Sequence, residues 1–99
     1  MPPFHYYRGR GAARYLLDVQ SSQLDGLATR VVVPLVLAGD RFPDFLALNP
    51  FLVVEGERFV MMTTLIAALP KRVLGRPLGN LLDQADDITR ALNILLSGF

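Results

Sequence analysis

The segment FLVVEGERFVMMT, residues 51–63, decides how this chain is expected to fold. Two apolar runs, residues 51–54 and 58–63, flank the short loop Glu55-Gly56-Glu57. Strands favour β-branched and aromatic residues, and a short glycine-containing loop between two such runs is typical of a β-hairpin. The segment therefore predicts two antiparallel strands joined by a tight turn.

Three runs upstream also have the composition of strands. Residues 15–20 and 30–35 are rich in β-branched, aromatic and aliphatic residues, and the turn formers of SSQLDGLAT separate them. Residues 4–7 predict a further strand, followed by a basic loop, Arg8-Gly9-Arg10-Gly11. Pro34 lacks the N–H group that a strand ladder uses, so we expect it at an edge, a bulge or a strand end.

The last part of the chain changes to a helical period. Residues 70–79, with two prolines and two glycines, predict an irregular connection. Spacings of four, three, four and three then place on one stripe of an α-helix the residues Leu81, Ala85, Ile88, Leu92 and Leu95. Asn80 is a suitable N-cap, and Asp83 puts negative charge near the positive end of the helix dipole. Gly98 is suited to end the helix, which should run to Ser97.

Two apolar residues of this helix, Ile94 and Leu96, lie off the stripe and are expected to face a second subunit or a partner. The chain is 52% hydrophobic and 19% charged, against about 45–50% and about 25% in average soluble domains. A chain of 99 residues leaves much of its surface facing solvent, so self-association is an economical way to cover the excess. We expect one domain, residues 1–99, in a homodimer that is mainly β with a C-terminal helix.

Composition also excludes several classes of function. Ten basic and nine acidic residues give a net charge of +1, which argues against direct, sequence-specific nucleic-acid binding. Without cysteine there is no disulfide or thiolate site, and the single histidine, His5, argues against a metal site or a His-dependent nucleophilic site. No cofactor is expected. No apolar run approaches the roughly 20 residues that span a bilayer, and MPPFHYYRGR lacks the apolar segment of a signal peptide. We expect a cytoplasmic protein without a membrane partner.

Four strings make the chain recognisable: RYLLDVQS at residues 14–21, RVVVPL at 30–35, MMTT at 61–64 and DITRALNILLSGF at 87–99. Together, in this order, they resemble the CcdB family, the toxins of CcdA–CcdB type II toxin–antitoxin modules. The resemblance is collinear over essentially the whole chain. It implies an SH3-like barrel, shared by CcdB and MazF toxins, with a small additional sheet, a C-terminal helix and a homodimeric assembly.

The resemblance also implies a function without enzymatic chemistry. CcdB-like toxins bind the A subunit of bacterial DNA gyrase and trap the gyrase–DNA cleavage complex, so that double-strand breaks accumulate. A CcdA-like antitoxin neutralises them with a disordered C-terminal segment. This chain is therefore expected to be a toxin that acts as a gyrase inhibitor and topoisomerase poison.

Site residues follow from the same resemblance. The family's gyrase contacts lie at the end of the C-terminal helix and on a neighbouring loop, which here correspond to Leu24, Asn93, Leu96, Ser97, Gly98 and Phe99. Gln23 stands where the family has an apolar residue. The basic loop residues Arg8, Gly9 and Arg10 are expected to dock the antitoxin, with a plain surface turn as the alternative.

Ser97 departs from the family pattern, which ends in Trp-Gly-Ile and uses the tryptophan as its main stacking anchor. This chain has no tryptophan. Losing an aromatic anchor typically costs about 2 kcal/mol or more, roughly thirtyfold in affinity. Phe99 compensates only if its ring points outward, and the alternative is that it folds back against the barrel.

Two other functions stay open. A non-toxic or retargeted CcdB-like protein would bind antitoxin and poison gyrase weakly or not at all. In a MazF-like endoribonuclease, Arg30 with Thr63 or Thr64 would supply phosphate-binding and acid/base groups. The near-neutral charge and the lack of a clear acid/base pair argue against the ribonuclease, and a shared fold alone does not support it.

Overall fold

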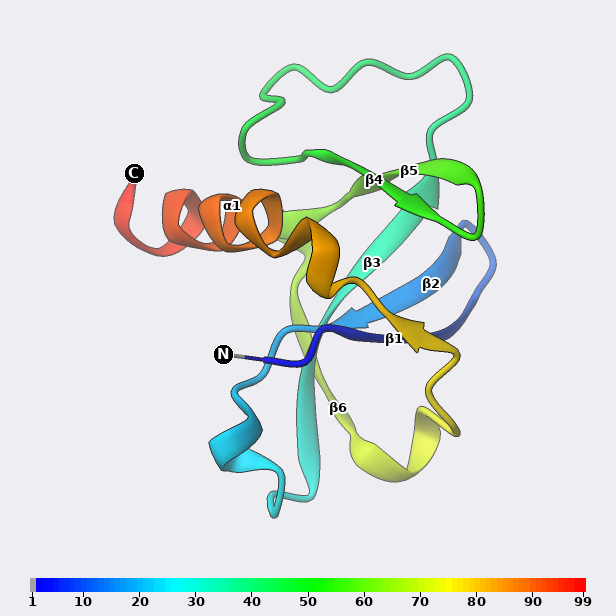
Figure 1. Ribbon diagram of the computed structural model, residues 1–99, viewed down its shortest axis with the longest axis vertical. Coiled ribbons are helices and arrows are strands. Elements are labelled where there is room, and N and C mark those ends of the chain that lie inside the picture. Colours follow the sequence, from blue (N-terminus) through cyan, green and yellow to red (C-terminus); the bar gives the residue numbers. More distant parts are fainter. Residues whose placement is uncertain (1) are drawn as a thin grey trace.

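Residues 2–99 are described by the structure, a computed structural model. Its regular elements are β1 (His5–Arg10), β2 (Ala13–Asp18), β3 (Thr29–Leu37), β4 (Phe51–Val54), β5 (Glu57–Met61), β6 (Ala67–Pro70), β7 (Gly79–Asn80) and α1 (Ala85–Ser97). Short 3-10 turns lie between them: η1 (Ser22–Leu24), η2 (Thr63–Leu65), η3 (Lys71–Val73) and η4 (Leu82–Gln84). Figure 1 shows the strands as one curled sheet with α1 lying against it. This half-barrel with a C-terminal helix confirms the expected fold class.

Strand order in the sheet is β4-β5-β3-β2-β1-β7, with all neighbours antiparallel. The long strand β3 pairs with β2 on one side. On its other side it pairs first with β6 and then, from Leu35 onward, with β5. Figure 1 shows the consequence, a sheet that divides at the middle of β3 and curls around the core.

Pro34 occupies the point at which β3 changes partner. The prediction that it lies at an edge, a bulge or a strand end is wrong, because β3 continues through it and pairs it with Leu16 of β2. Its carbonyl accepts a hydrogen bond from the Met62 N–H at 3.0 Å on the side away from β2. The missing N–H of Pro34 falls where the ladder passes from β6 to β5, so no strand hydrogen bond is lost.

The predicted hairpin is confirmed in β4 and β5. Val54 pairs with Glu57, which leaves a turn of two residues, Glu55 and Gly56. Their φ angles are 50° and 81°, and a type I′ turn needs positive φ at both positions. The first turn position is thus filled by a glutamate in a conformation that non-glycine residues seldom adopt.

Arg8, Gly9 and Arg10 lie in β1 and not in a loop, so that part of the prediction is wrong. β1 continues to Arg10, which pairs with Ala13. Gly9 is needed for close packing of the two strands, because a Cβ at this position would meet the Ala13 carbonyl oxygen. β6 and β7 were also missed, since the alanines and proline of β6 and the glycine and asparagine of β7 carry little strand signal.

Helix α1 begins at Ala85, four residues later than the stripe predicts, because η4 precedes it. The Asn80 side chain accepts the Leu82 N–H at 3.1 Å, so it contacts the first residue of η4 and is not the N-cap of α1. At the other end the prediction is confirmed: Gly98 adopts the left-handed conformation with φ 84°, and its N–H donates to the Ile94 carbonyl at 2.9 Å.

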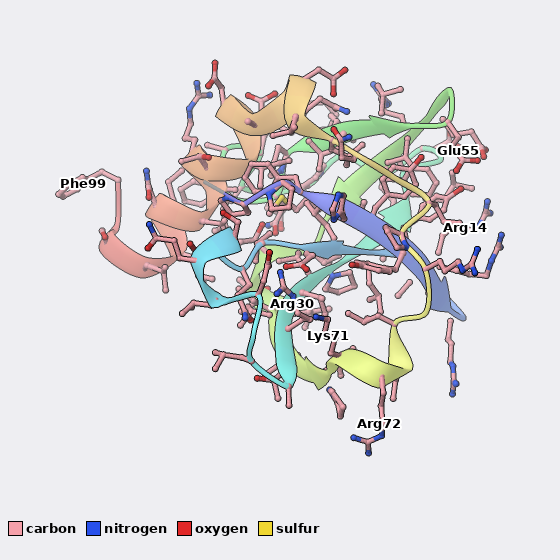
Figure 2. All side chains as sticks on the ribbon, turned by 60° about the horizontal axis from the view of Figure 1, so that its bottom comes forward. Arg14, Arg30, Glu55, Lys71, Arg72 and Phe99 are labelled. Atoms are coloured by element: carbon pink, nitrogen blue, oxygen red, sulfur yellow. The ribbon has the colours of Figure 1, made fainter. Side chains whose placement is uncertain are left out.

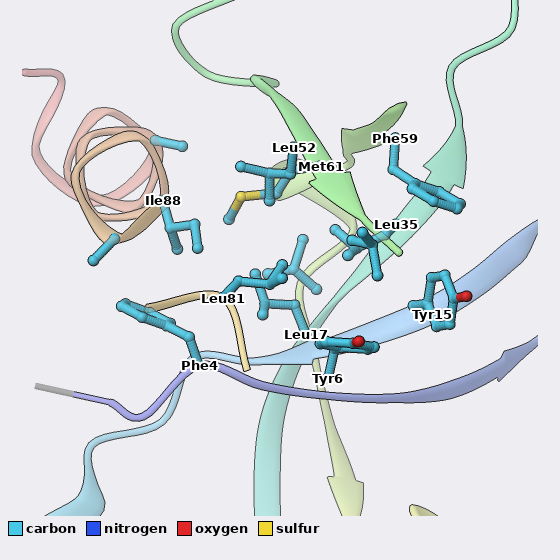
Figure 3. Close-up of a cluster of buried hydrophobic side chains, with 14 residues drawn as sticks. Phe4, Tyr6, Tyr15, Leu17, Leu35, Leu52, Phe59, Met61, Leu81 and Ile88 are labelled. Carbon is cyan, nitrogen blue, oxygen red and sulfur yellow. The ribbon is translucent and has the colours of Figure 1, made fainter. Parts of the chain in front are cut away.

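The core lies between the concave face of the sheet and α1 (Figure 3). Tyr15 stacks edge to face with Tyr6 and Phe59, at centroid separations of 5.3 and 5.1 Å. Ile88 brings the helix onto this cluster and is fully buried. Just before α1, the Gln84 side chain accepts the Val53 N–H and donates to the Val53 carbonyl, both at 2.8 Å. These contacts fix the start of α1 and so set the direction in which its far end projects.

Candidate partner-binding surface

Beyond its first half, α1 projects away from the core. Ala85, Ile88 and Ala91 are its buried residues, and none of residues 92–99 is buried. Figure 1 shows this end of the helix extending past the sheet. It is nevertheless apolar: Leu96 is 77% exposed. Burial on one side therefore holds α1 in place, while its C-terminal end offers apolar surface to the solvent.

Phe99 points away from its own core. Its ring is 89% exposed, and Figure 2 shows it at the periphery of the molecule. The left-handed conformation of Gly98 turns the chain out of the helical path immediately before it. The alternative in which Phe99 folds back against the barrel is therefore wrong.

The other residues expected at this surface are also accessible. Asn93, Ser97 and Gly98 are exposed at the end of α1, and positions 93 and 97 share one face of the helix. Leu24 is 47% exposed on η1. Figure 1 shows η1 and the end of α1 on the same side of the molecule.

A buried polar cluster next to η1 was not predicted from the sequence. Asp18 and Arg30 are 1% and 4% exposed. Arg30 Nε and Nη2 each lie 2.8 Å from Asp18 Oδ2, and Nη1 lies 3.0 Å from Asp25 Oδ1. The hydrogen bond to Asp18 raises the pKa of Arg30 above its usual value, against the opposing effect of burial. The sequence signal that could have indicated this cluster is the presence of polar residues at inward-facing positions of two otherwise apolar strands.

This cluster bears on the ribonuclease alternative. The Arg30 guanidinium is buried and engaged by two carboxylates, so it is not placed to bind a phosphate. Thr63 is fully buried, and its hydroxyl lies 3.4 Å from the Met61 carbonyl oxygen as a hydrogen-bond donor. Thr64 is exposed. The geometry gives the ribonuclease alternative no support.

Arg8 and Arg10 border a groove on a different part of the molecule. The groove, of about 430 Å³, has an apolar floor formed by Leu16, Leu69, Pro70 and Val73. Within residues 2–99, neither arginine forms an ion pair. β1 runs away from the N-terminus toward the opposite side of Figure 1 from the end of α1. The residues predicted for gyrase at the end of α1 and those predicted for antitoxin therefore lie on separate surfaces.

Over residues 2–99, the structure gathers no group of three or more His, Asp or Glu side chains that could hold a metal ion. In the same range no helix has the length and apolar character needed to cross a membrane. A comparison with models of known protein families matches residues 3–98 to the family described as CcdB protein.

Proposed function

Because the chain belongs to the CcdB family and is thus a toxin of a toxin–antitoxin module, we propose that it binds the A subunit of bacterial DNA gyrase. Bound there, it traps the gyrase–DNA cleavage complex in the bacterial cytoplasm and performs no chemistry itself. The observation that supports this proposal is the apolar end of α1, where Leu96 is 77% and Phe99 89% exposed. Large apolar side chains offered to solvent are typical anchors of a protein interface.

A homodimer is part of the proposal. Leu92, Ile94 and Leu95 are only half-buried in the single chain, although they continue the apolar character of α1 beyond its last buried residue. A twofold contact along this half of the helix would cover them. It would also present two copies of Phe99 together, which suits a target that is itself a symmetric dimer.

Restoring the family's aromatic anchor is expected to strengthen gyrase binding. Ser97→Trp should lower the toxin concentration that traps cleaved DNA by roughly thirtyfold, because a buried aromatic anchor typically contributes about 2 kcal/mol. The measurement is a plasmid cleavage assay with gyrase from the source organism. Thr89→Trp, at an exposed position of α1 away from its end, is the matched control. Equal potency of Ser97→Trp and wild type would contradict the role given to this position.

The same assay decides between the proposal and its closest alternative. Because Ser97 replaces the tryptophan, the chain could bind antitoxin and poison gyrase weakly or not at all. Wild-type protein that traps no cleaved DNA, together with an active Ser97→Trp variant, would favour that alternative. Inactivity of both proteins would count against gyrase as the target.

For the antitoxin we propose the groove beside Arg8 and Arg10. Two unpaired arginines above an apolar floor suit an acidic segment that also carries apolar side chains. Val73 of this floor is 56% exposed, so part of its apolar surface is open to a partner. Gly9 brings β1 and β2 close together beneath it. A CcdA-like antitoxin with a disordered C-terminal segment would supply such a chain.

Neutralising these two arginines is expected to weaken antitoxin binding and to leave gyrase binding unchanged. Arg8→Gln combined with Arg10→Gln should lower antitoxin affinity by about tenfold at low salt, and the loss should shrink as salt rises. Titration calorimetry at two salt concentrations measures both effects. Arg90→Gln is the control, because within residues 2–99 this cation is paired only with exposed Asp87. Antitoxin affinity unaffected by the double substitution would exclude this groove.

A further inference from the structure

The segment between β2 and β3 that carries Leu24 has no apolar anchor of its own. Residues 22–29 are all exposed, and η1 contributes no buried side chain. Fixing the backbone of a residue costs conformational entropy, and burial of apolar side chains normally offsets this cost. Here burial within the segment cannot do so. Besides hydrogen bonds of the turn itself, such as that from the Leu24 N–H to the Ser21 carbonyl, residues 22–29 are held by polar contacts from neighbouring elements.

Gln20 supplies two of these contacts with one buried side chain, which is 6% exposed. Its Oε1 accepts the Val31 N–H at 2.9 Å, and its Nε2 donates to the Leu24 carbonyl at 3.1 Å. The backbone N–H of Gln20 is in turn held by Asp18 Oδ1 at 2.9 Å. A single amide therefore joins the start of the segment, its tip and the strand that follows it.

Asp25, the residue after Leu24, is held from two further elements. Its carboxylate lies 3.0 Å from Arg30 Nη1 of β3, and its carbonyl accepts Lys71 Nζ of η3 at 3.2 Å. Figure 2 shows Arg30 and Lys71 close together beside this segment. Arg30 is itself fixed by the buried Asp18. Leu24 and Asp25 are thus clamped by three side chains, while the Leu24 side chain remains half exposed.

Stabilisation of the fold does not by itself explain why these buried polar groups are present. A buried ion pair such as Asp18–Arg30 can often be replaced by apolar residues of similar volume at little or no cost in folding free energy. An apolar pair, however, cannot hold the polar backbone of an exposed segment. The buried polar groups therefore serve to hold the backbone of the exposed segment.

We propose that Gln20, Arg30 and Lys71 are positioning residues, which fix Leu24 in its partner-binding conformation before the partner arrives. The inference rests on the proposed function, because it takes Leu24 to be part of the gyrase-binding surface. A preordered segment binds more tightly, since the entropy of ordering it is lost on folding and not on binding. Releasing the clamp should weaken gyrase binding by about tenfold without a comparable loss of fold.

Two substitutions test the clamp from different sides. Lys71→Ala removes an exposed contact to the Asp25 carbonyl. Arg72→Ala removes the neighbouring cation of η3, for which the described part of the chain shows no hydrogen bond or ion pair, and is its matched control. Gln20→Met removes both amide contacts from a position too buried to touch a partner. Lys71→Ala is the safer variant if Gln20→Met folds poorly.

The first readout is amide hydrogen exchange, which does not depend on gyrase. The Leu24 and Leu27 N–H groups donate to the Ser21 and Leu24 carbonyls at 3.0 and 3.1 Å, so their exchange reports the order of the segment. Exchange should be about tenfold faster in Lys71→Ala and Gln20→Met than in wild type and Arg72→Ala. Unchanged exchange in both variants would overturn the clamp.

The second readout is affinity for the purified gyrase A subunit. About tenfold weaker binding of Lys71→Ala and Gln20→Met, with Arg72→Ala like wild type, supports the positioning role. Faster exchange with unchanged affinity overturns it. If wild-type protein does not bind the A subunit, the proposed function fails, and the exchange data still decide whether these side chains order the segment.

Discussion

We expect that removal of Ser97, Gly98 and Phe99 abolishes toxicity and lowers gyrase affinity at least about thirtyfold. The three residues lie beyond the last buried residue of α1, and Phe99 is 89% exposed. The backbone contacts that are lost lie at the exposed end of α1, among them the hydrogen bond from the Gly98 N–H to the Ile94 carbonyl. The free energy of unfolding should therefore fall by no more than about 1 kcal/mol.

Growth of cells that express the truncated chain measures this outcome, and urea unfolding of the purified protein checks that the fold is retained. Val53→Ala is the control, because Val53 is an exposed apolar side chain, 52% accessible, on β4 rather than at the end of α1. It should leave toxicity unchanged. Growth arrest by a truncated protein that is expressed and folded would show that the working surface lies elsewhere.

Asp18→Ala should lower the free energy of unfolding by about 3–5 kcal/mol, because it leaves a buried charge without its partner. Asp18 Oδ2 has two Arg30 nitrogen atoms at 2.8 Å, and Arg30 is only 4% exposed. The substitution also takes the acceptor from the Gln20 N–H. Such a loss is a large part of the roughly 5–15 kcal/mol that stabilises a typical domain.

Asp87→Ala makes the same chemical change at an exposed ion pair. Asp87 Oδ1 lies 3.8 Å from Arg90 Nη1, and both side chains are more than half exposed. This substitution should lower the free energy of unfolding by less than about 0.5 kcal/mol. Urea unfolding of the two variants beside wild type gives the comparison, and similar midpoints for both would show that Asp18 and Arg30 are not coupled as the structure indicates.

The sequence correctly predicted those elements that depend on residues close to one another in the chain. The hairpin of β4 and β5 followed from a glycine-containing turn between two apolar runs, and the end of α1 followed from Gly98. The start of α1 did not, because Asn80 bonds to the first residue of a 3-10 turn that has the same sequence signature as a helix N-terminus. β1 was predicted too short because Gly9 signals a turn in isolation, whereas pairing with β2 requires it.

The candidate site was predictable only in part, for a related reason. Resemblance to a known family indicated the residues at the end of α1, and helical periodicity explained why several of them are not buried. The outward direction of Phe99 depends on the backbone of Gly98, which no spacing rule gives. The clamp on Leu24 joins Gln20, Arg30 and Lys71 from separate elements, and that proximity exists only in the folded chain.

Titration calorimetry of the purified protein with the gyrase A subunit tests the central claim most directly. We predict saturable binding of one toxin dimer per dimer of the A subunit, with affinity at least about thirtyfold lower for Phe99→Ala. Absence of binding by wild type, or equal affinity of wild type and Phe99→Ala, would contradict the claim that the exposed end of α1 is the gyrase-binding surface.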